Sequence, residues 1–381
     1  MGNRIYYAVE QIGIRPASSG NGPFVAVHGV QSASTSTSIN IEPVSEFGAI
    51  PIAARLENSV NNSISIVKVL DGYPLLYLTA TSDAGTPWLI DRVMQRCAIA
   101  MSIYDENITW FATNSGIAVA QYTGLYLSSI KYKFDTASAF EEEIVFEGPN
   151  KIWNIDTDII NPTEVILQPS ITTNNPGRFD NKDTPKPKVS YRWNFIMPNI
   201  GITGIDASHF PTEVSGQHIT SITTSATINR THIESFGDKG LHFRMPNFPI
   251  EVTTEFSVVP TGFDKISVSD QGILTAISGG CYDIGNVSGQ FISIATCDGL
   301  RLSLGYNNYL VATNWQGGDA RGGSVHVGYI YKTYNDFIMT MSTGDNFYQQ
   351  RQQWLQPVPY ESLQAQDWGL MVEDTWGLLQ V

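Results

Sequence analysis

Hydrophobic and polar residues alternate with a period of two along much of the chain, and this pattern predicts β-strands. The segment 140–147 shows the alternation most clearly. One face carries Phe140, Glu142, Ile144 and Phe146, and the other carries Glu141, Glu143, Val145 and Glu147. Further strands are predicted within 25–41, 51–69, 99–110, 117–121 and 125–134. The pattern indicates an all-β fold.

The strand predicted over 25–41 has an unusual composition. Every residue of 32–38 except Ala33 is a serine or a threonine. This run leaves few large apolar groups on either face of the strand. Such a strand suits a position where its faces meet other protein or line the wall of a crowded channel.

One segment has helical spacing instead. Thr86 can cap a helix and Pro87 can occupy its first position. One face then carries Ile90, Val93, Met94 and Cys97. We predict an amphipathic helix of about three turns that covers the open side of the first sheet. The second half of the chain has no obvious counterpart.

A stretch of the chain occurs twice. Residues 25–48 match residues 214–237 without a gap, and eight of the twenty-four positions are identical. Upstream, Ile12-Gly13-Ile14 matches Ile200-Gly201-Ile202; downstream, after a nine-residue insertion, Pro51-Ile52 matches Pro249-Ile250. Strand-forming residues are common in every β-protein, but co-linear matches over about sixty residues favour an internal duplication.

The repeat predicts four segments. They are a first β-sandwich domain at 1–155, a Pro-rich linker at 156–188, a second related domain at 189–341, and an aromatic and Gln-rich arm at 342–381. The arm is too apolar to extend freely into water, so we expect it to lie along its own chain or a neighbour. Its candidate inter-subunit contacts are Trp354, Tyr360, Trp368 and Trp376.

Composition and charge narrow the function. The 381 residues include 36 acidic and 22 basic side chains, for a net charge of −14. This balance disfavours a protein that grips nucleic acid, because phosphate contacts need Lys and Arg. The spacing of Cys97, Cys281 and Cys297 fits neither a metal knuckle nor a disulfide framework, so we expect core thiols in a reducing compartment. No signal peptide or membrane span is recognisable, and synthesis in the cytoplasm is expected.

Motifs for catalysis are missing. The sequence has no phosphate-binding loop, dinucleotide fingerprint, zinc-binding histidine pair or nucleophile elbow. His218 and His232 have no histidine counterparts in the first copy, and Asp156, Asp158 and Glu164 lack the spacing of a calcium loop. A glycoside hydrolase is disfavoured because no pair of acids recurs in both copies. We expect no enzyme, no cofactor and no metal.

The duplication suggests how the chain assembles. An all-β domain has sheet edges to protect, and closing copies into a ring removes those edges. Head-to-tail contacts generate rings, and stacked rings generate filaments. A chain with two copies supplies two wall segments, so three chains would form a ring of six domains.

Several segments resemble the tail tube proteins of long-tailed bacteriophages. In the first copy they are Val27-His28-Gly29-Val30-Gln31-Ser32, Phe47-Gly48 and Val67-Lys68-Val69-Leu70-Asp71-Gly72-Tyr73-Pro74. In the second they are Glu234-Ser235-Phe236-Gly237-Asp238-Lys239-Gly240, Phe248-Pro249-Ile250-Glu251-Val252-Thr253-Thr254-Glu255-Phe256 and Tyr331-Lys332-Thr333-Tyr334-Asn335-Asp336-Phe337. The resemblance extends over most of 4–341 and consists of loose consensus segments.

The resemblance implies a β-sandwich tube domain with one flanking helix, stacked as rings around a β-lined lumen. It further implies a virion location in the tail, a tape-measure protein that first fills the lumen, and passage of viral DNA without specific binding. An acidic wall would repel phosphates and let DNA slide. We therefore predict that Glu141, Glu143 and Glu147 line part of the lumen, although an acidic face turned to bulk water is an alternative.

Two other functions fit the sequence. A distal tail or baseplate ring protein of the same fold would differ from a tube subunit in its copy number. A carbohydrate-binding module of a receptor-binding protein would use exposed aromatic residues such as Trp110, Trp315 or Trp354 to stack on sugar rings.

Overall fold

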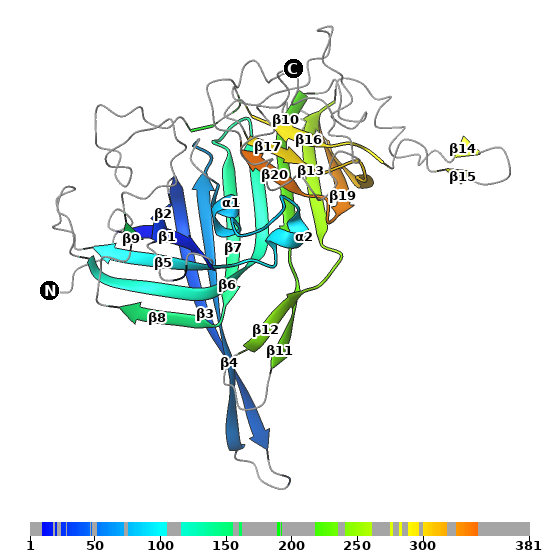
Figure 1. Ribbon diagram of the computed structural model, residues 1–381. Helices are drawn as coiled ribbons and strands as arrows, with labels where there is room; N and C mark the ends of the chain where they lie inside the picture. Colours follow the sequence, from blue (N-terminus) through cyan, green and yellow to red (C-terminus); the bar gives the residue numbers. More distant parts are fainter. Residues whose placement is uncertain are drawn as a thin grey trace, which may run out of the picture.

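The computed structural model is built almost entirely of β-strands (Figure 1). It describes residues 10–17, 20, 24–27, 29–45, 47, 52–71, 75–104, 116–154, 160–161, 189–190, 192, 218–234, 241–260, 275–276, 282–283, 289–296, 300–317 and 325–341. The all-β class is confirmed. The predicted linker, apart from 160–161, and the whole C-terminal arm lie outside the described residues.

The strands of the first half are β1 (Glu10–Pro16), β2 (Phe24–Ala26), β3 (Val30–Ser45), β4 (Ile52–Val69), β5 (Arg96–Tyr104), β6 (Gly116–Asp135), β7 (Glu141–Gly148), β8 (Asn150–Asn154) and β9 (Ile160–Asn161). Those of the second half are β10 (His218–Thr227), β11 (Arg230–Glu234), β12 (Leu241–Pro246), β13 (Glu251–Val259), β14 (Thr275–Ala276), β15 (Tyr282–Asp283), β16 (Ser293–Ala295), β17 (Leu300–Ser303), β18 (Tyr309–Gln316), β19 (His326–Tyr334) and β20 (Ile338–Met341). Thirteen of these strands belong to one sheet.

Each half contributes four antiparallel strands in the same order. The first four-strand unit runs β3-β4-β7-β6, and the second four-strand unit runs β10-β13-β19-β18. Each unit consists of two hairpins, β3–β4 and β6–β7 in the first and β10–β13 and β18–β19 in the second. In each unit the second strand of the first hairpin pairs with the second strand of the other, as β4 does with β7 and β13 with β19. The order of pairing along the sheet is therefore repeated, although the two units have different lengths of chain between their hairpins.

The two units also share their irregularities. A β-bulge leaves Gln31 unpaired between β3 and β4, and a bulge leaves Thr220, 189 positions later, unpaired between β10 and β13. A bulge at Ser128 in β6 recurs at Val311 in β18, 183 positions later. Bulges re-aim the strand that carries them, so the matching positions give the two units the same local twist and register.

The strand registers correct one detail of the sequence comparison. Thr35 lies opposite Ile64 in the first hairpin, and Thr224 lies opposite Thr254 in the second. Equivalent partners are thus 29 and 30 residues apart along the chain. The chain between these paired positions is only one residue longer in the second hairpin. The nine-residue insertion predicted before Pro249 therefore does not occur.

The two units are joined edge to edge. The last strand of the first unit, β6, pairs antiparallel with the first strand of the second unit, β10, from Ser129↔Thr227 to Asp135↔Ser221. Eight strands therefore follow one another without interruption from β3 to β18. Of these eight, β3 and β18 each pair on one side only within the described part of the chain.

Strand β6 also connects the sheet to a second layer. Its first half pairs with β5 and β8, and its second half pairs with β7 and β10. Gly124 lies at the bend with a positive φ of 68°, a conformation that favours glycine. Helix α1 contacts β1, β5 and β7, and side chains such as Ile14, Ile99 and Ile144 share one core.

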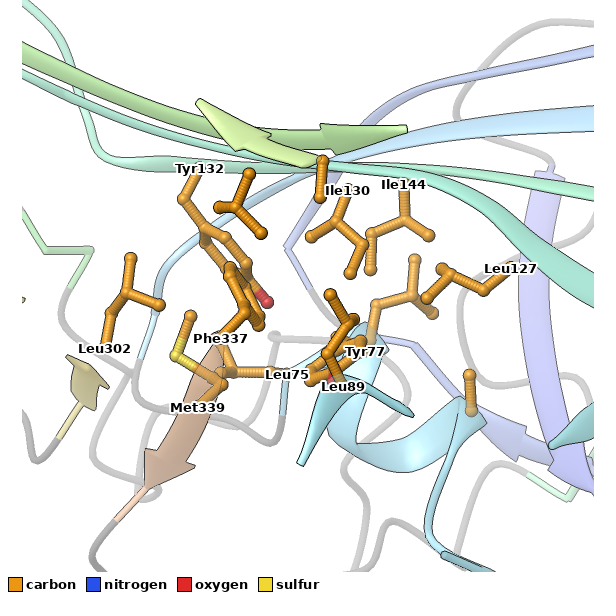
Figure 2. Packing of buried hydrophobic residues seen from close by; sticks show 14 of the residues in the cluster. Leu75, Tyr77, Leu89, Leu127, Ile130, Tyr132, Ile144, Leu302, Phe337 and Met339 are labelled. Carbon is orange, nitrogen blue, oxygen red and sulfur yellow. The ribbon is translucent and has the colours of Figure 1, made fainter. Parts of the chain in front are cut away.

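The larger of two apolar clusters in the described residues spans both halves. Phe337, which precedes β20, contacts the rings of Tyr77 and Tyr132 at centroid distances of 5.7 and 6.2 Å. In Figure 2 Phe337 and Met339 lie beside these first-half residues and Leu75. Burial on this scale stabilises each large side chain by about 1.5–3 kcal/mol. The two halves are thus joined by side-chain packing as well as by the β6–β10 ladder.

The helical prediction is partly wrong. Two short helices, α1 (Leu76–Ala80) and α2 (Leu89–Arg92), replace the expected three-turn helix, and Cys97 lies in β5. Leu89 and Val93 are buried, whereas Ile90 and Met94 remain exposed at 41% and 39%. The Thr86 side chain accepts a hydrogen bond from the Trp88 amide at 3.4 Å, but the chain leaves the helix after one turn.

Two hairpins project from the sheet. The ends of β3 and β4 continue outward as a long ribbon, and β11 and β12 form a second ribbon on the same side of the molecule (Figure 1). Ile39 and Ile41 on the first ribbon are exposed at 54% and 50%, and Ile233 and Met245 on the second at 45% and 48%. Apolar groups on projecting ribbons are candidates for contacts with another molecule.

Candidate functional site

The three acids predicted to line a lumen lie on one face of β7. Burial alternates along Glu141–Gly148 as the sequence predicts, with Glu141, Glu143 and Glu147 on the less buried side. We call this side of the eight-strand sheet the open face. The opposite side packs against α1, β16, β17 and β20 in the core. The structure confirms that the three acids share a face; that this face lines a lumen stays a prediction.

The open face is acidic, but its charges are interleaved. Lys131 of β6 contacts Glu143 at 3.1 Å, and Arg244 of β12 lies 3.9 Å from Glu147. From β7 to β19 the strands of this face carry six carboxylates against three ammonium groups, and the Arg244 guanidinium of β12 adds a fourth cation beside Glu147. The carboxylates are Asp135, Glu141, Glu143, Glu147, Glu251 and Glu255, and the ammonium groups are Lys131, Lys133 and Lys332. The exposed pair of Lys131 and Glu143 contributes little stability and acts mainly by setting the surface charge.

A buried polar network lies on the other side of the same strand. The Glu142 carboxylate accepts hydrogen bonds from the backbone amides of Leu76 and Tyr77, at 2.8 and 3.1 Å, and from the Tyr132 hydroxyl at 2.6 Å. Burial raises the pKa of Glu142, while the hydrogen bond from Tyr132 and the charge of Lys68 oppose that shift. Glu142 therefore anchors the first turn of α1 to the sheet.

A buried ion pair accompanies this network. The Lys68 ammonium donates to the Asp71 carboxylate at 2.5 Å and to the Val69 carbonyl at 3.1 Å, and its side chain is 0% exposed. The sequence placed Glu142 on the apolar face of its strand but gave it no role. The partners of Glu142 lie 10 to 66 residues away, so no local motif could have identified the network.

Two arginines of the second half bind backbone and side-chain groups of the first. Arg230 donates to the carbonyls of Val93 and Leu127 at 2.6 and 3.0 Å, and burial lowers its pKa to about 10. Arg244 donates to the Asn61 amide oxygen of β4 at 2.9 Å. Neither arginine is recognisable from the sequence, because an isolated arginine in a strand resembles any solvated charge. Together they fix the β11–β12 ribbon against the first four-strand unit.

The two free edges form the second candidate surface. Residues 31–39 of β3 are mostly exposed, and so are Tyr309, Val311 and Trp315 of β18, at 44%, 50% and 46%. Neither 30–39 nor 309–316 contains a charged residue or a proline. Edge strands of proteins that stay monomeric are commonly protected by charges, prolines or bulges. These two edges lack charge and proline protection.

The remaining predicted residues are placed as follows. Trp110, the carboxylates at 156, 158 and 164, Cys281, Cys297 and the four aromatic residues of the arm all lie outside the described residues. Cys97 is a buried free thiol. Within the described ranges, no group of three or more His, Cys, Asp or Glu side chains could hold a metal ion. None of the helices in that part of the chain has the length and apolar character to span a bilayer.

No family model matches the chain, and no curated protein matches it in sequence. Several solved structures match part of it. A chain of the PVC sheath–tube complex of an extracellular contractile injection system, in its extended state, is 12% identical with a TM-score of 0.29 and covers 40% of this chain and 92% of that one. A chain of the cap that terminates the anti-feeding prophage tube is 13% identical with a TM-score of 0.30, covering 41% and 93%. An Hcp protein is 9% identical with a TM-score of 0.22, covering 38% and 98%.

Proposed function

We propose that the chain is a structural subunit of a hollow tube, of the kind that forms the tails of long-tailed bacteriophages, and that it has no enzymatic role. The observation that carries this proposal is the edge-to-edge joining of two four-strand units with the same strand order and the same bulges. We infer that an ancestral wall unit was duplicated and fused, so that one junction between wall units became part of a single chain.

The duplicated units account for a ring. Each chain supplies eight strands that are adjacent in one sheet, so three chains would supply twenty-four strands to a closed wall with six units. Closure removes the free edges of β3 and β18. The projecting ribbons β3–β4 and β11–β12, with Ile39 and Ile233 exposed, would contact the next ring and stack the rings into a tube.

The open face suits the lumen of such a tube. Its short hydroxyl side chains and its excess of carboxylates leave no continuous basic track for phosphates. DNA would slide past Glu141, Glu143 and their equivalents without sticking, after the tape-measure protein has left. The apolar face is already covered by the core of the same chain, and so it is not free to line a channel.

Electron microscopy of the purified protein in negative stain tests this function. We expect six-lobed rings or hollow polymers to form as the protein is concentrated. A chain that stays monomeric at high concentration would contradict the proposal. Counting copies in particles then separates the tube from a distal tail or baseplate ring, because a tube subunit repeats along the whole tail.

A carbohydrate-binding role is the alternative from another class. Trp315 is half exposed at the edge of the sheet, as stacking on a sugar would require. A glycan array separates the two functions. Specific glycan binding that a Trp315→Ala variant loses, in a protein that forms no rings, would replace the tube proposal.

A further inference from the structure

The junction between β6 and β10 shows how one wall unit pairs with the next. Its partners are Ile130↔Ala226, Tyr132↔Thr224 and Phe134↔Ile222 on the core face. The strand equivalent to β6 in the second unit is β18, and the strand equivalent to β10 in the first unit is β3. These are the two strands whose outer edges are free within the described chain.

We propose that β18 of one chain pairs with β3 of a second copy, antiparallel and in the register that β6 and β10 already show. Adding 183 to a β6 residue number gives its equivalent in β18, and subtracting 189 from a β10 residue number gives its equivalent in β3. The internal partners then predict Trp315 opposite Thr35, Thr313 opposite Thr37, and Asn314 opposite Ser36. The assignment specifies the lateral contact of the proposed tube and rests on that function.

The backbone groups of the β3 edge point toward the position that a neighbouring strand would take. At the internal junction the Thr136 amide donates to the Thr220 carbonyl, and the Ile228 amide donates to the Ser128 carbonyl. The backbone amide and carbonyl groups of successive residues point to opposite sides of a strand. Those of the even-numbered residues between 220 and 228 therefore also point toward β6. Their equivalents in β3 include Thr35 and Thr37, whose amide and carbonyl groups therefore face the free edge.

The side chains at the two edges are compatible with this register. Tyr132 at the internal junction is 0% exposed, whereas its equivalent Trp315 is 46% exposed. A neighbouring β3 would extend the sheet beside Trp315, as β10 does beside Tyr132. On the open face, Ser36 would meet Asn314, two small polar groups that bring no like charges together. Trp315 is thereby assigned to a contact between copies.

Disulfide trapping tests the register directly. Ser36 and Asn314 correspond to Ser225 and Lys131, a pair between the hydrogen-bonded pairs, where Cα atoms are closest at about 4.5 Å. Within one chain they lie seven strand spacings apart, on the order of 30 Å, so they can join only between copies. The full-length Ser36→Cys/Asn314→Cys protein is oxidised, and its products are resolved by non-reducing electrophoresis and peptide mass spectrometry. The same sample is imaged.

Matched controls define the outcome. Ser36→Cys paired with Ala312→Cys or with Gln316→Cys places the thiols on the same face but two residues out of register. We expect the 36–314 pair to give covalent dimers and trimers in about tenfold higher yield, because a two-residue shift exceeds the reach of a disulfide. Each single-cysteine variant reports any linkage to Cys97, Cys281 or Cys297.

The possible results separate the register from the function. Tubes or rings with efficient 36–314 linkage support both. Tubes that link at 312 or 316, or at none of these positions, overturn the register and leave the tube function standing. Linked oligomers that close into no ring support the edge pairing alone. Protein that neither links nor assembles overturns the pairing and the function together.

Discussion

Buried charges illustrate how single residues hold this fold together. Lys68 and Asp71 are 0% and 3% exposed, whereas the equally direct pair of Lys131 and Glu143 is 46% and 38% exposed. Water screens the exposed pair of Lys131 and Glu143 and hydrates either side chain when the other is removed. The buried pair of Lys68 and Asp71 has no such access to water, so its loss costs more. The two pairs therefore form a matched comparison.

We expect Lys68→Met to lower the free energy of unfolding by about 3–5 kcal/mol, because the buried Asp71 carboxylate loses its ion pair with Lys68. The control, Lys131→Met, is expected to change it by about 0–1 kcal/mol, since its partner stays in water. Urea unfolding at concentrations where the chain is monomeric measures both values. A Lys68→Met loss no larger than that of the control would show that Lys68 is not buried as described.

The pH dependence of stability tests the environment of Glu142. Burial raises the pKa of folded Glu142 above the ordinary value of 4.5. Its contribution to stability is then fully present below pH 4.5 and is lost as the pH rises through the raised folded-state pKa. Glu142→Gln removes that titration and leaves one α1 amide without its acceptor, at a cost of about 1–3 kcal/mol.

We therefore expect the difference in the free energy of unfolding between wild type and Glu142→Gln to become smaller as the pH is raised from 4.5. Unfolding free energies measured across this range, with Glu141→Gln as the control on the opposite face of the same strand, check the sign. A widening advantage would mean that Lys68 and the Tyr132 hydroxyl outweigh burial and lower the pKa.

Among the elements, β3 connects the internal ladder with the proposed external one. Ser36 lies opposite Ser63 and bonds inward to β4, whereas the backbone of its neighbour Thr35 faces the free edge. Proline removes one amide donor and is tolerated in a strand only where that donor is free. Adjacent substitutions in one strand can thus separate folding from assembly.

We expect Thr35→Pro to leave the free energy of unfolding within about 0.5 kcal/mol of wild type and to prevent ring formation at concentrations where wild type assembles. The matched variant Ser36→Pro breaks an internal bond and is expected to lose about 1–3 kcal/mol. Analytical ultracentrifugation and thermal unfolding measure the two effects. Rings of normal appearance from Thr35→Pro would exclude β3 as the lateral contact.

Local patterning predicted the elements that depend on local contacts. The alternation over 140–147 gave the correct faces of β7, including the burial of Glu142. The helix prediction was wrong because distant contacts decide that segment: Arg92 turns inward to bond Thr81, and Glu142 accepts the amides that start α1. The pairing of β6 with β10 joins residues about ninety positions apart, and nothing in either strand specifies the other.

For the whole molecule, the continuity of the sheet changes what the proposed duplication implies. Two independent domains on a linker could rotate and would present four separate edges. Here the β6–β10 ladder, Arg230 and the packing of Phe337 against Tyr77 fix the second unit against the first. Within the described residues, the eight-strand run is thus one continuous double unit with its outer edges at β3 and β18, a geometry in which adding copies would extend one sheet.

In the proposed tube, every chain would repeat the charge of the open face along the wall. We expect tubes of wild-type protein not to retain short double-stranded DNA. Tubes of Glu141→Lys/Glu143→Lys should retain it, because repeated ammonium groups would face the phosphates from every unit. Retention should fall by on the order of 10³-fold or more between about 50 and 200 mM salt. Co-sedimentation of labelled DNA with the tubes measures it.

Two controls locate the bound DNA. Glu141→Gln/Glu143→Gln removes the same acids without adding cations, and its tubes are expected to release DNA as wild type does. Nuclease treatment then separates the two surfaces of the wall, since DNA inside the lumen is shielded and DNA on the outside is digested. Retained DNA that the nuclease destroys would place β7 and the open face on the exterior of the tube, and the acids would then serve solubility instead of conduction.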